Sequence, residues 1–406
     1  MNKKLLTLAS IVTTAVALTT GSWASATVAY KSSILESGLV SPRGITLGPD
    51  GNLYLTEAGN GGGSNGSNCI VAGSGNTVCY GATGAIGEYN LSNNLYRQLI
   101  TDLPSLATKT GTDGTGIHDL YFDNGGNLYG ILGFGADPSL RSNLGISSFG
   151  KLISVNLSGT PSWSVGPDIS AYEAANNPDG LEINSNPYSL AIGNGITYVA
   201  DAGGNDILQV SNTETISLTH LFPTQSVNLP FPPFAPYPMQ AVPTGIVIGP
   251  DNNLYIAQFT GFPFPPGGAS IYRLNSGGVT QFATGFTNLI GLAFGPNGDL
   301  FALQYATDYL GGNFQGSVWE ITPDGTKTNI FSEGLVSPTG IAVSSDGTIY
   351  VANRGAVAGE GELLALTPVP EPSNQGGIIL LGVGLIPLIK RKVQDLTLKL
   401  PKSDDD

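Results

Sequence analysis

The chain repeats one short phrase six times, and this repeat constrains the fold more than any other feature of the sequence. The first copy, at residues 41–57, joins an apolar run, a Pro-Asp-Gly turn and a second run rich in β-branched and aromatic residues. Clear copies follow at 242–258, 289–304 and 337–353, and looser copies lie at 118–129 and 187–201. A repeat with strand patterns in every unit is typical of solenoids, propellers and arrays.

Each repeat predicts a meander of short antiparallel strands. The run at 340–343 is continuously apolar, as in a strand that is buried on both faces. The Asp-Gly and Asn-Gly pairs that follow such runs favour tight hairpins, because these turns need positive φ. Residues 316–321 and 326–331 complete the third and fourth strands of one unit. We therefore predict an all-β fold, a six-bladed β-propeller of four-stranded antiparallel blades; a β-solenoid, with its shorter repeats, is the alternative.

The two ends of the repeat region predict how the ring closes. After the sixth copy only one further strand remains, at 362–366, so the last blade lacks its outer strand. An unassigned strand, at 27–35, precedes the first copy. Pairing of these N- and C-terminal strands would close the ring and remove two exposed sheet edges. The predicted propeller spans residues 27–367.

The N-terminal segment has the pattern of an export signal. Residues 1–26 contain two lysines, an apolar run at 5–18 and the small residues Ala24, Ser25 and Ala26. This is the order of a secretory signal peptide. We expect an exported protein of the periplasm, cell surface or extracellular matrix.

The C-terminal segment resembles the PEP-CTERM sorting signal of Gram-negative bacteria. Residues 368–375 form a linker that contains Pro370, Glu371 and Pro372. A hydrophobic segment with a basic stop follows at 376–392, and a polar tail at 393–406. The resemblance implies an exosortase-type sorting enzyme as a partner and transient membrane association through this segment. An uncleaved C-terminal anchor is the alternative.

Charge and cysteine content narrow the function classes. The formal net charge is −14, which argues against a nucleic-acid partner, since such proteins need a basic face. The only cysteines are Cys69 and Cys79, ten residues apart in an insertion rich in Gly, Ser and Asn. In an exported protein this pair predicts a disulfide.

Alignment of the six copies places two rings of residues around the predicted channel. The first ring, which precedes the signature glycine, contains Arg43, His118, Tyr188, Thr244, Ile290 and Thr339. The second ring, which closes the second strand, contains Glu57, Leu132, Asp201, Gln258, Gln304 and Asn353. Polar groups that converge on one concavity are typical of ligand sites. We predict such a site at the channel mouth, formed by Arg43, Glu57, His118, Asp119, Tyr188, Asp201, Gln258, Gln304 and Asn353.

Each of these side chains also has a structural interpretation. Arg43 and Glu57 suit an ion pair between adjacent strands, and Asp201 suits a turn cap before two glycines. His118 suits a hydrogen-bonded wall residue, and Tyr188 suits packing. A catalytic alternative uses Glu57, Asp201 and Asn353, whose oxygens are suited to a hard divalent cation such as calcium. In that interpretation the protein is a metal-dependent lactonase- or lyase-like enzyme that also uses His118.

Two loops rich in proline and aromatic residues lie in the fourth repeat, at 222–243 and 262–266. Proline restricts such loops at low entropic cost while they display aromatic faces. They predict contact with a small aromatic ligand, derived from indole or phenol, or with an envelope protein. Packing against a neighbouring blade is the alternative.

Several stretches resemble the ScyD/ScyE family, exported propellers named from the cyanobacterial gene cluster for the pigment scytonemin. The resemblance is carried by the segments 185–190, 199–206, 260–269, 285–288 and 292–296. The string Phe262-Pro263-Phe264-Pro265 is its most specific part. The resemblance implies an NHL-like propeller with a non-catalytic binding or scaffold role in the cell envelope, associated with scytonemin production. It supplies no catalytic residues.

Overall fold

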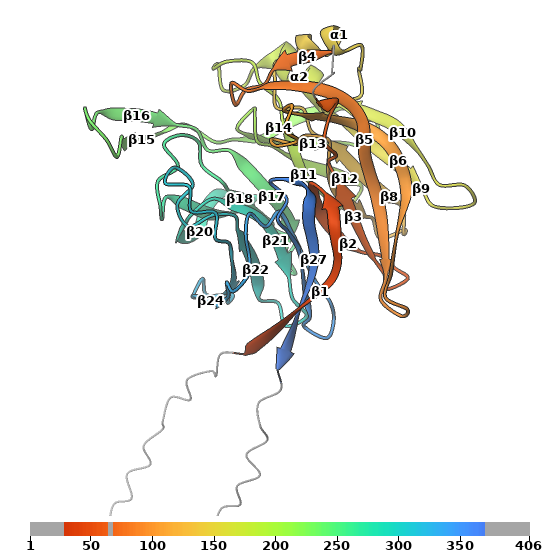
Figure 1. Cartoon of the computed structure of the whole chain (residues 1–406). Helices are drawn as coiled ribbons and strands as arrows, with labels where there is room; N and C mark the ends of the chain where they lie inside the picture. The colour runs from red at the N-terminus through yellow and green to blue at the C-terminus, as the bar shows by residue number, and fades with distance from the viewer. Residues whose placement is uncertain (1–27, 64–67, 370–406) are drawn as a thin grey trace, which may run out of the picture. The chain divides into compact units, whose positions relative to one another are not determined.

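Six antiparallel sheets build the domain, as the computed structural model of residues 28–63 and 68–369 shows (Figure 1). Blade 1 contains β2 (Pro42–Leu47), β3 (Leu53–Glu57), β5 (Thr77–Asn90) and β6 (Leu95–Ala107). Blade 2 contains β7 (Ile117–Phe122), β8 (Leu128–Leu132), β9 (Lys151–Asn156) and β10 (Ser162–Asp168). Blade 3 contains β11 (Pro187–Gly193), β12 (Ile196–Asp201), β13 (Asp206–Val210) and β14 (Ile216–Leu221).

The second half of the ring has the same organisation. Blade 4 contains β17 (Pro243–Ile248), β18 (Leu254–Gln258), β19 (Ala269–Asn275) and β20 (Gly278–Phe286). Blade 5 contains β21 (Leu289–Phe294), β22 (Leu300–Gln304), β23 (Ser317–Ile321) and β24 (Lys327–Phe331). Blade 6 contains β25 (Gly340–Val343), β26 (Ile349–Asn353) and β27 (Ala358–Val369), with β1 (Ala29–Val40) as its outer strand.

The inner strands form a closed ring. Each of β2, β7, β11, β17, β21 and β25 contacts the next, and β25 contacts β2. The ring is closed by β1, which pairs with β27 from Ala29 opposite Val369 to Val40 opposite Ala358. The predicted six-bladed propeller, closed by its two terminal strands, is therefore confirmed. The last strand runs two residues beyond the expected end of the domain at residue 367. The expected signal peptide and sorting segment lie outside the described residues.

The core consists of apolar clusters between consecutive blades. Ile271 and Ala283 of blade 4, for example, pack with Leu289 and Leu292 of blade 5. Every other interface between neighbouring blades has a cluster of the same kind. The strands are buried on both faces because each sheet packs between two others, which explains the continuous apolar runs in the sequence.

The signature glycines mark where the inner strands approach one another. A Cβ on Gly44 would lie 2.8 Å from the Cα of Asp119, and a Cβ on Gly245 would lie 3.0 Å from the Cα of Gly291. Backbone atoms at such distances leave no room for a side chain. Four of the six copies therefore keep glycine where the strands crowd around the channel, and the copies of blades 2 and 3 have Asp119 and Ser189 there.

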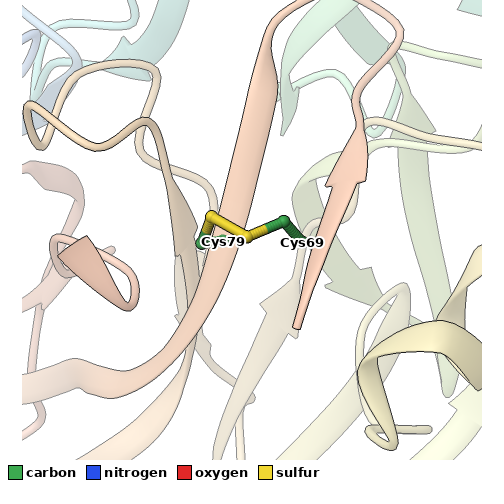
Figure 2. Close-up of a disulfide and its surroundings, with 2 residues drawn as sticks. All are labelled: Cys69 and Cys79. Atoms are coloured by element: carbon green, nitrogen blue, oxygen red, sulfur yellow. A yellow bond between two sulfur atoms is a disulfide. The ribbon is translucent and has the colours of Figure 1, made fainter. Parts of the chain in front are cut away.

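Three insertions interrupt the repeat. The first contains β4 (Cys69–Val71), which pairs with the start of β5 and places Cys69 directly opposite Cys79. Their disulfide has an S–S distance of 2.05 Å, so the predicted bridge is confirmed (Figure 2). The second has two parts that contact each other: η2 (Pro138–Leu140) and α1 (Arg141–Leu144) lie between β8 and β9, and α2 (Ile169–Asn176) follows β10. The third is the hairpin of β15 (Gln225–Asn228) and β16 (Pro236–Met239), which projects from the ring in Figure 1. Among the described residues, no helix is long and apolar enough to span a bilayer.

Candidate functional site

A cavity of about 710 Å³ lies at the end of the ring that carries the three insertions. All six residues of the first ring line it. A second cavity, of about 330 Å³, is lined by the inner strands of all six blades. His118, Tyr188, Ile290 and Thr339 line both cavities, so the first ring lies between them. The larger cavity is the channel mouth.

His118 and Tyr188 form part of the floor of this cavity. Their ring centroids are 4.7 Å apart, and Nδ1 of His118 lies 3.3 Å from the carbonyl oxygen of Pro187. Burial and the nearby charge of Arg43 lower the pKa of His118 to about 3. Burial raises the pKa of Tyr188 to about 12. Both side chains are therefore neutral at pH 7, and Arg43 is the charged member of the first ring.

Arg43 is held by backbone carbonyl groups. Its Nη1 donates to the carbonyl oxygens of Pro42 at 3.0 Å and Gly355 at 2.6 Å, and its Nη2 donates to that of Gly114 at 2.6 Å. The guanidinium is buried and forms no ion pair with any carboxylate in the described part of the chain. These three hydrogen bonds use three of its five N–H donors, and the other two have no acceptor among the described residues.

Asp119 lies deeper in the channel, on the lining of the second cavity. Its carboxylate accepts hydrogen bonds from Ser189 Oγ at 2.6 Å and from the backbone N–H of Leu120 at 2.9 Å. Burial raises the pKa of Asp119 to about 6, although these hydrogen bonds partly oppose the shift. Ser189 occupies the equivalent position of blade 3, so the pair joins two inner strands.

The polar members of the second ring line neither cavity. Four of them accept a hydrogen bond from the backbone segment that leads into the inner strand of the same blade. The donors are Val40 to Glu57 at 2.6 Å, Asn186 to Asp201 at 2.7 Å, Thr287 to Gln304 at 2.9 Å and Val336 to Asn353 at 2.9 Å. The fifth, Gln258, accepts from the hydroxyl of Tyr272 at 3.3 Å. The second ring thus fixes the loops that enter the inner strands.

Glu57 does not form the cross-strand ion pair with Arg43 that its position in the sequence suggested. Its Oε1 accepts from the hydroxyl of Tyr96 at 2.5 Å and from Nε2 of Gln98 at 2.7 Å, whereas Arg43 binds carbonyl oxygens. Glu57, Asp201 and Asn353 lie on β3, β12 and β26 of three different blades. Within residues 28–63 and 68–369, no group of three or more His, Cys, Asp or Glu side chains is arranged to hold a metal ion.

One wall of the cavity is aromatic. Phe264 and Tyr309 have ring centroids 4.6 Å apart, and Phe259 lies 5.7 Å from both Tyr305 and Tyr309. Phe262 joins them, with Tyr237 of the projecting hairpin 5.1 Å away. The other aromatic residues belong to blades 4 and 5, and all of them, Tyr237 included, line the cavity. They include parts of both Pro/aromatic loops.

The opposite wall comes from the first insertion. Ala72, Gly73, Ser74 and Val78, which surround the disulfide-bonded hairpin, line the cavity. Asp113 is exposed on its rim, where its carboxylate accepts from Ser74 Oγ at 2.8 Å. The disulfide therefore stabilises a wall of the candidate site.

Two tyrosines of the candidate site were not predicted from the sequence. Tyr305 and Tyr309 follow the fifth copy of the phrase, in a loop that no other copy resembles. Their only signal was the position of Tyr305 directly after a second-ring residue, Gln304. A loop that follows this ring necessarily lies near the channel mouth.

Comparison with known proteins assigns this chain to no family. No family model matches the chain, and no curated protein matches it. Among solved structures, a gluconolactonase from Xanthomonas campestris is 9% identical, with a TM-score of 0.49 over 84% of this chain and 90% of that one. A catalytically inactive virginiamycin B lyase from Staphylococcus aureus is 16% identical, with a TM-score of 0.45 over 84% and 99%. At this level of similarity, neither a functional site nor an activity can be assigned to this chain from those structures. The fold and cavity define a six-bladed β-propeller with a cavity of ligand size at its channel mouth.

Proposed function

We propose that this protein is an exported binding propeller that holds a small aromatic carboxylate at its channel mouth. The observation that carries the proposal is the pairing, in one cavity, of an arginine without an acidic partner in the described chain and a wall of aromatic rings. The volume of about 710 Å³ is in the range of small-molecule sites.

The charge of Arg43 favours an anion. A buried cation that is bound only by neutral carbonyl groups retains part of its desolvation cost, which an anionic ligand would offset. Carboxylates match the planar fork of a guanidinium, because two parallel N–H groups can donate to two oxygens. With His118 neutral, Arg43 is the cationic partner within the cavity.

The aromatic wall favours a planar ring. Aromatic pairs in offset or edge-to-face geometry add about 0.5–1.5 kcal/mol beyond the area that they bury. Phe264 and Tyr309 already pack with tilted rings at the cavity surface, so a ligand ring between them and Arg43 would extend the cluster. Indole and phenol derivatives fit this description.

Export and an envelope location are part of the proposal. The disulfide supports an oxidising compartment, where such bonds persist. The resemblance to the ScyD/ScyE family favours a place near scytonemin assembly, and the Pro370-Glu371-Pro372 segment favours processing by an exosortase-type enzyme. N-terminal sequencing of the protein recovered from the periplasm tests the export step, with a first residue near 27 expected.

Binding is favoured over catalysis by the state of the available bases. A histidine whose pKa is about 3 is a weak general base near neutral pH. Asp119 is engaged with Ser189, and the carboxylate of Glu57 is engaged with Tyr96 and Gln98. We therefore do not advance the lactonase- or lyase-like reaction as a second function.

Isothermal titration calorimetry of the full chain tests the proposal. The probes are indole-3-acetate and 4-hydroxyphenylacetate. Two control compounds, here called matches, each lack one feature: indole-3-acetamide lacks the charge, and cyclohexylacetate lacks the aromatic ring. We expect both aromatic acids to bind about tenfold or more tightly than either match, because each match lacks one of the two interactions. Equal binding of all four compounds, or no binding, would contradict the proposal.

Two substitutions assign the binding to the cavity. Phe264→Leu and Tyr309→Leu remove the wall and should weaken binding of indole-3-acetate about tenfold. Phe314→Leu is the matched control, since this ring packs 5.5 Å from Tyr309 but does not line the cavity. If Phe314→Leu weakens binding as much as the other two, the ligand binds elsewhere.

A further inference from the structure

Outside the channel mouth, blade 3 buries three carboxylates around one glycine. Glu173 on α2, Asp201 at the end of β12 and Asp206 at the start of β13 are each 1% exposed. A Cβ on Gly204 would lie 3.2 Å from Oε2 of Glu173, 3.5 Å from Cγ of Asp201 and 3.6 Å from Cγ of Asp206. The three carboxyl groups therefore lie on the same side of Gly204, with Oε2 of Glu173 the nearest of them.

The three carboxylates differ in their hydrogen bonds. Asp201 is satisfied: its oxygens accept from Ser185 Oγ at 2.7 Å and from the backbone N–H groups of Asn186, Gly203 and Gly204. By contrast, both carboxylate oxygens of Asp206 are buried without a donor. Both oxygens of Glu173 are also buried without a well-formed hydrogen bond, and the backbone N–H of Asn184 only partly opposes the rise in the pKa of Glu173. Such atoms are costly, because each has lost its water without a replacement.

Two further oxygens without a donor lie on the segment between α2 and blade 3, where the side chain of Asn184 lies against Gly73 at the channel-mouth cavity. Asn177 ends α2, and Asn184 lies seven residues later in the loop that leads to blade 3. The Oδ1 atoms of both are buried without a donor. Several buried acceptors without donors indicate a cation. Calcium takes six to eight oxygen ligands from carboxylates, amides and carbonyl groups, in flexible geometry.

We propose that Glu173 and Asp206 bind a calcium ion in blade 3, beside Gly204, with amide or carbonyl oxygens of the loop at 177–186 as further ligands. This site is separate from the channel mouth and does not depend on the ligand proposed there. It also differs from the metal set expected from the sequence, since Glu57 and Asn353 are in other blades and Asp201 is already satisfied.

The electrostatics of the cluster agree with this geometry. Burial, followed by the charges of Asp201, Glu173 and Asp179, raises the pKa of Asp206 to about 9. Burial and the charges of Asp201 and Asp179 raise the pKa of Glu173 to about 7. Without a cation, Asp206 therefore retains its proton at neutral pH and Glu173 is about half protonated. A proton shared between Glu173 and Asp206 is therefore the alternative occupant, and the experiment must separate the two.

The position of the site suggests what the ion stabilises. Asn186, Ala202 and Gly203 line the channel-mouth cavity, and Asp201 binds the backbone of two of them. Asn205 donates to Asp179 at 2.9 Å and accepts from the backbone N–H of Val242 in the loop before blade 4. A bound ion would thus order one wall of the cavity and the junction between blades 3 and 4.

The test uses the full chain, stripped with EDTA and dialysed, at neutral pH. Calorimetric titration with CaCl₂, and thermal denaturation with and without it, are compared with MgCl₂ at equal ionic strength. We expect one calcium ion per chain, a higher Tm with calcium, and weaker binding of magnesium, because magnesium demands near-ideal octahedral geometry. Absence of both calcium heat and a change in Tm would overturn the proposal.

Two variants identify the ligands. In EDTA, Asp206→Asn and Glu173→Gln should leave the Tm close to that of the wild type, because each replaces a buried carboxyl group of raised pKa with a neutral amide of nearly the same size. Each should also weaken calcium binding by about tenfold or more and abolish the rise in Tm. Asp119→Asn, which changes a buried carboxylate in the channel, is the control and should retain the calcium response. Wild-type calcium affinity in Asp206→Asn would overturn the assignment. A lower Tm of Asp206→Asn in EDTA, with no calcium response in either protein, would assign the site to a shared proton.

Discussion

Arg43 of blade 1 donates a hydrogen bond from Nη1 to the carbonyl oxygen of Gly355 in blade 6, at 2.6 Å across the seam where the ring closes. A second bond crosses the same seam, from Thr339 Oγ1 to the carbonyl oxygen of Pro42 at 2.7 Å. The residue that supplies the charge of the channel mouth therefore also joins the first and last blades. Its substitution should affect both stability and ligand binding.

Arg43→Met should lower the free energy of unfolding by about 2–4 kcal/mol, because it leaves buried carbonyl groups without donors. Arg273→Met is the matched control: its partner is Asp251, 4.0 Å away, and the two side chains are 37% and 39% exposed. Removing such a surface pair costs about 0–1 kcal/mol. Urea denaturation of the three proteins measures the difference. Equal losses in both variants would show that the seam bonds add no stability.

His118 should make the protein sensitive to acid. Its pKa is lowered to about 3 in the folded chain, whereas an unfolded histidine titrates near its ordinary value of 6.5. Unfolding therefore takes up a proton below pH 6.5, so stability is fully present above 6.5 and is lost as the pH falls toward 3. The slope from this one group is about 1.4 kcal/mol per pH unit.

The variant His118→Gln should remove that slope, measured as the difference in unfolding free energy between variant and wild type from neutral to mildly acidic pH. His220→Gln is the control, because His220 is only partly buried and its pKa is lowered by burial alone. Parallel pH profiles for wild type and His118→Gln would contradict the neutral, buried state of His118.

Gly340→Ala should strongly destabilise the ring. The new Cβ would clash with the carbonyl oxygen of Arg43 and lie 3.2 Å from the Cα of Gly44. Neither atom can move without shifting an inner strand, so we expect a loss of about 2–3 kcal/mol or more. Gly166→Ala on β10 is the control, since its nearest contact is an ordinary 3.4 Å. Thermal denaturation compares them, and a Tm of Gly340→Ala equal to that of the control would refute the crowding argument.

The disulfide should stabilise a cavity wall more than the whole domain. Closing a loop of this length contributes about 2–3 kcal/mol in the chain-entropy model. The double variant Cys69→Ser/Cys79→Ser should lose that amount or less in urea denaturation. Because the neighbouring Gly73 and Val78 line the cavity, its affinity for indole-3-acetate should fall as well. Unchanged affinity would show that the hairpin keeps its position without the bridge.

The fold could be predicted because every repeat carries the same local signals. Apolar runs and tight turns rich in Asp, Asn and Gly recur in each copy, signature glycines recur in four of the six, and the two unpaired end strands leave one way to close the ring. The insertions could not be predicted in this way. Strand β4, the hairpin β15–β16 and the loop that bears Tyr305 and Tyr309 each occur once, so no alignment of repeats reports their position.

The candidate site was predictable only in part, because sequence position does not determine where a side chain points. Both rings follow from the repeat, yet Glu57 and Asp201 turn toward backbone N–H groups of the entering loops. Arg43 lines the cavity because its neighbours offer carbonyl oxygens at the seam. Glu173 lies near Asp206 only because α2 packs where blades 2 and 3 meet, and α2 belongs to no repeat.

A crystal of the full chain soaked with 5-bromoindole-3-acetate tests the central claim most directly, since bromine is located by its anomalous scattering. The account predicts one bromine peak in the channel-mouth cavity, beside Phe264 and Tyr309, with the ligand carboxylate on Arg43. A peak only outside that cavity, or none in a crystal whose channel mouth is open to solvent, would contradict it.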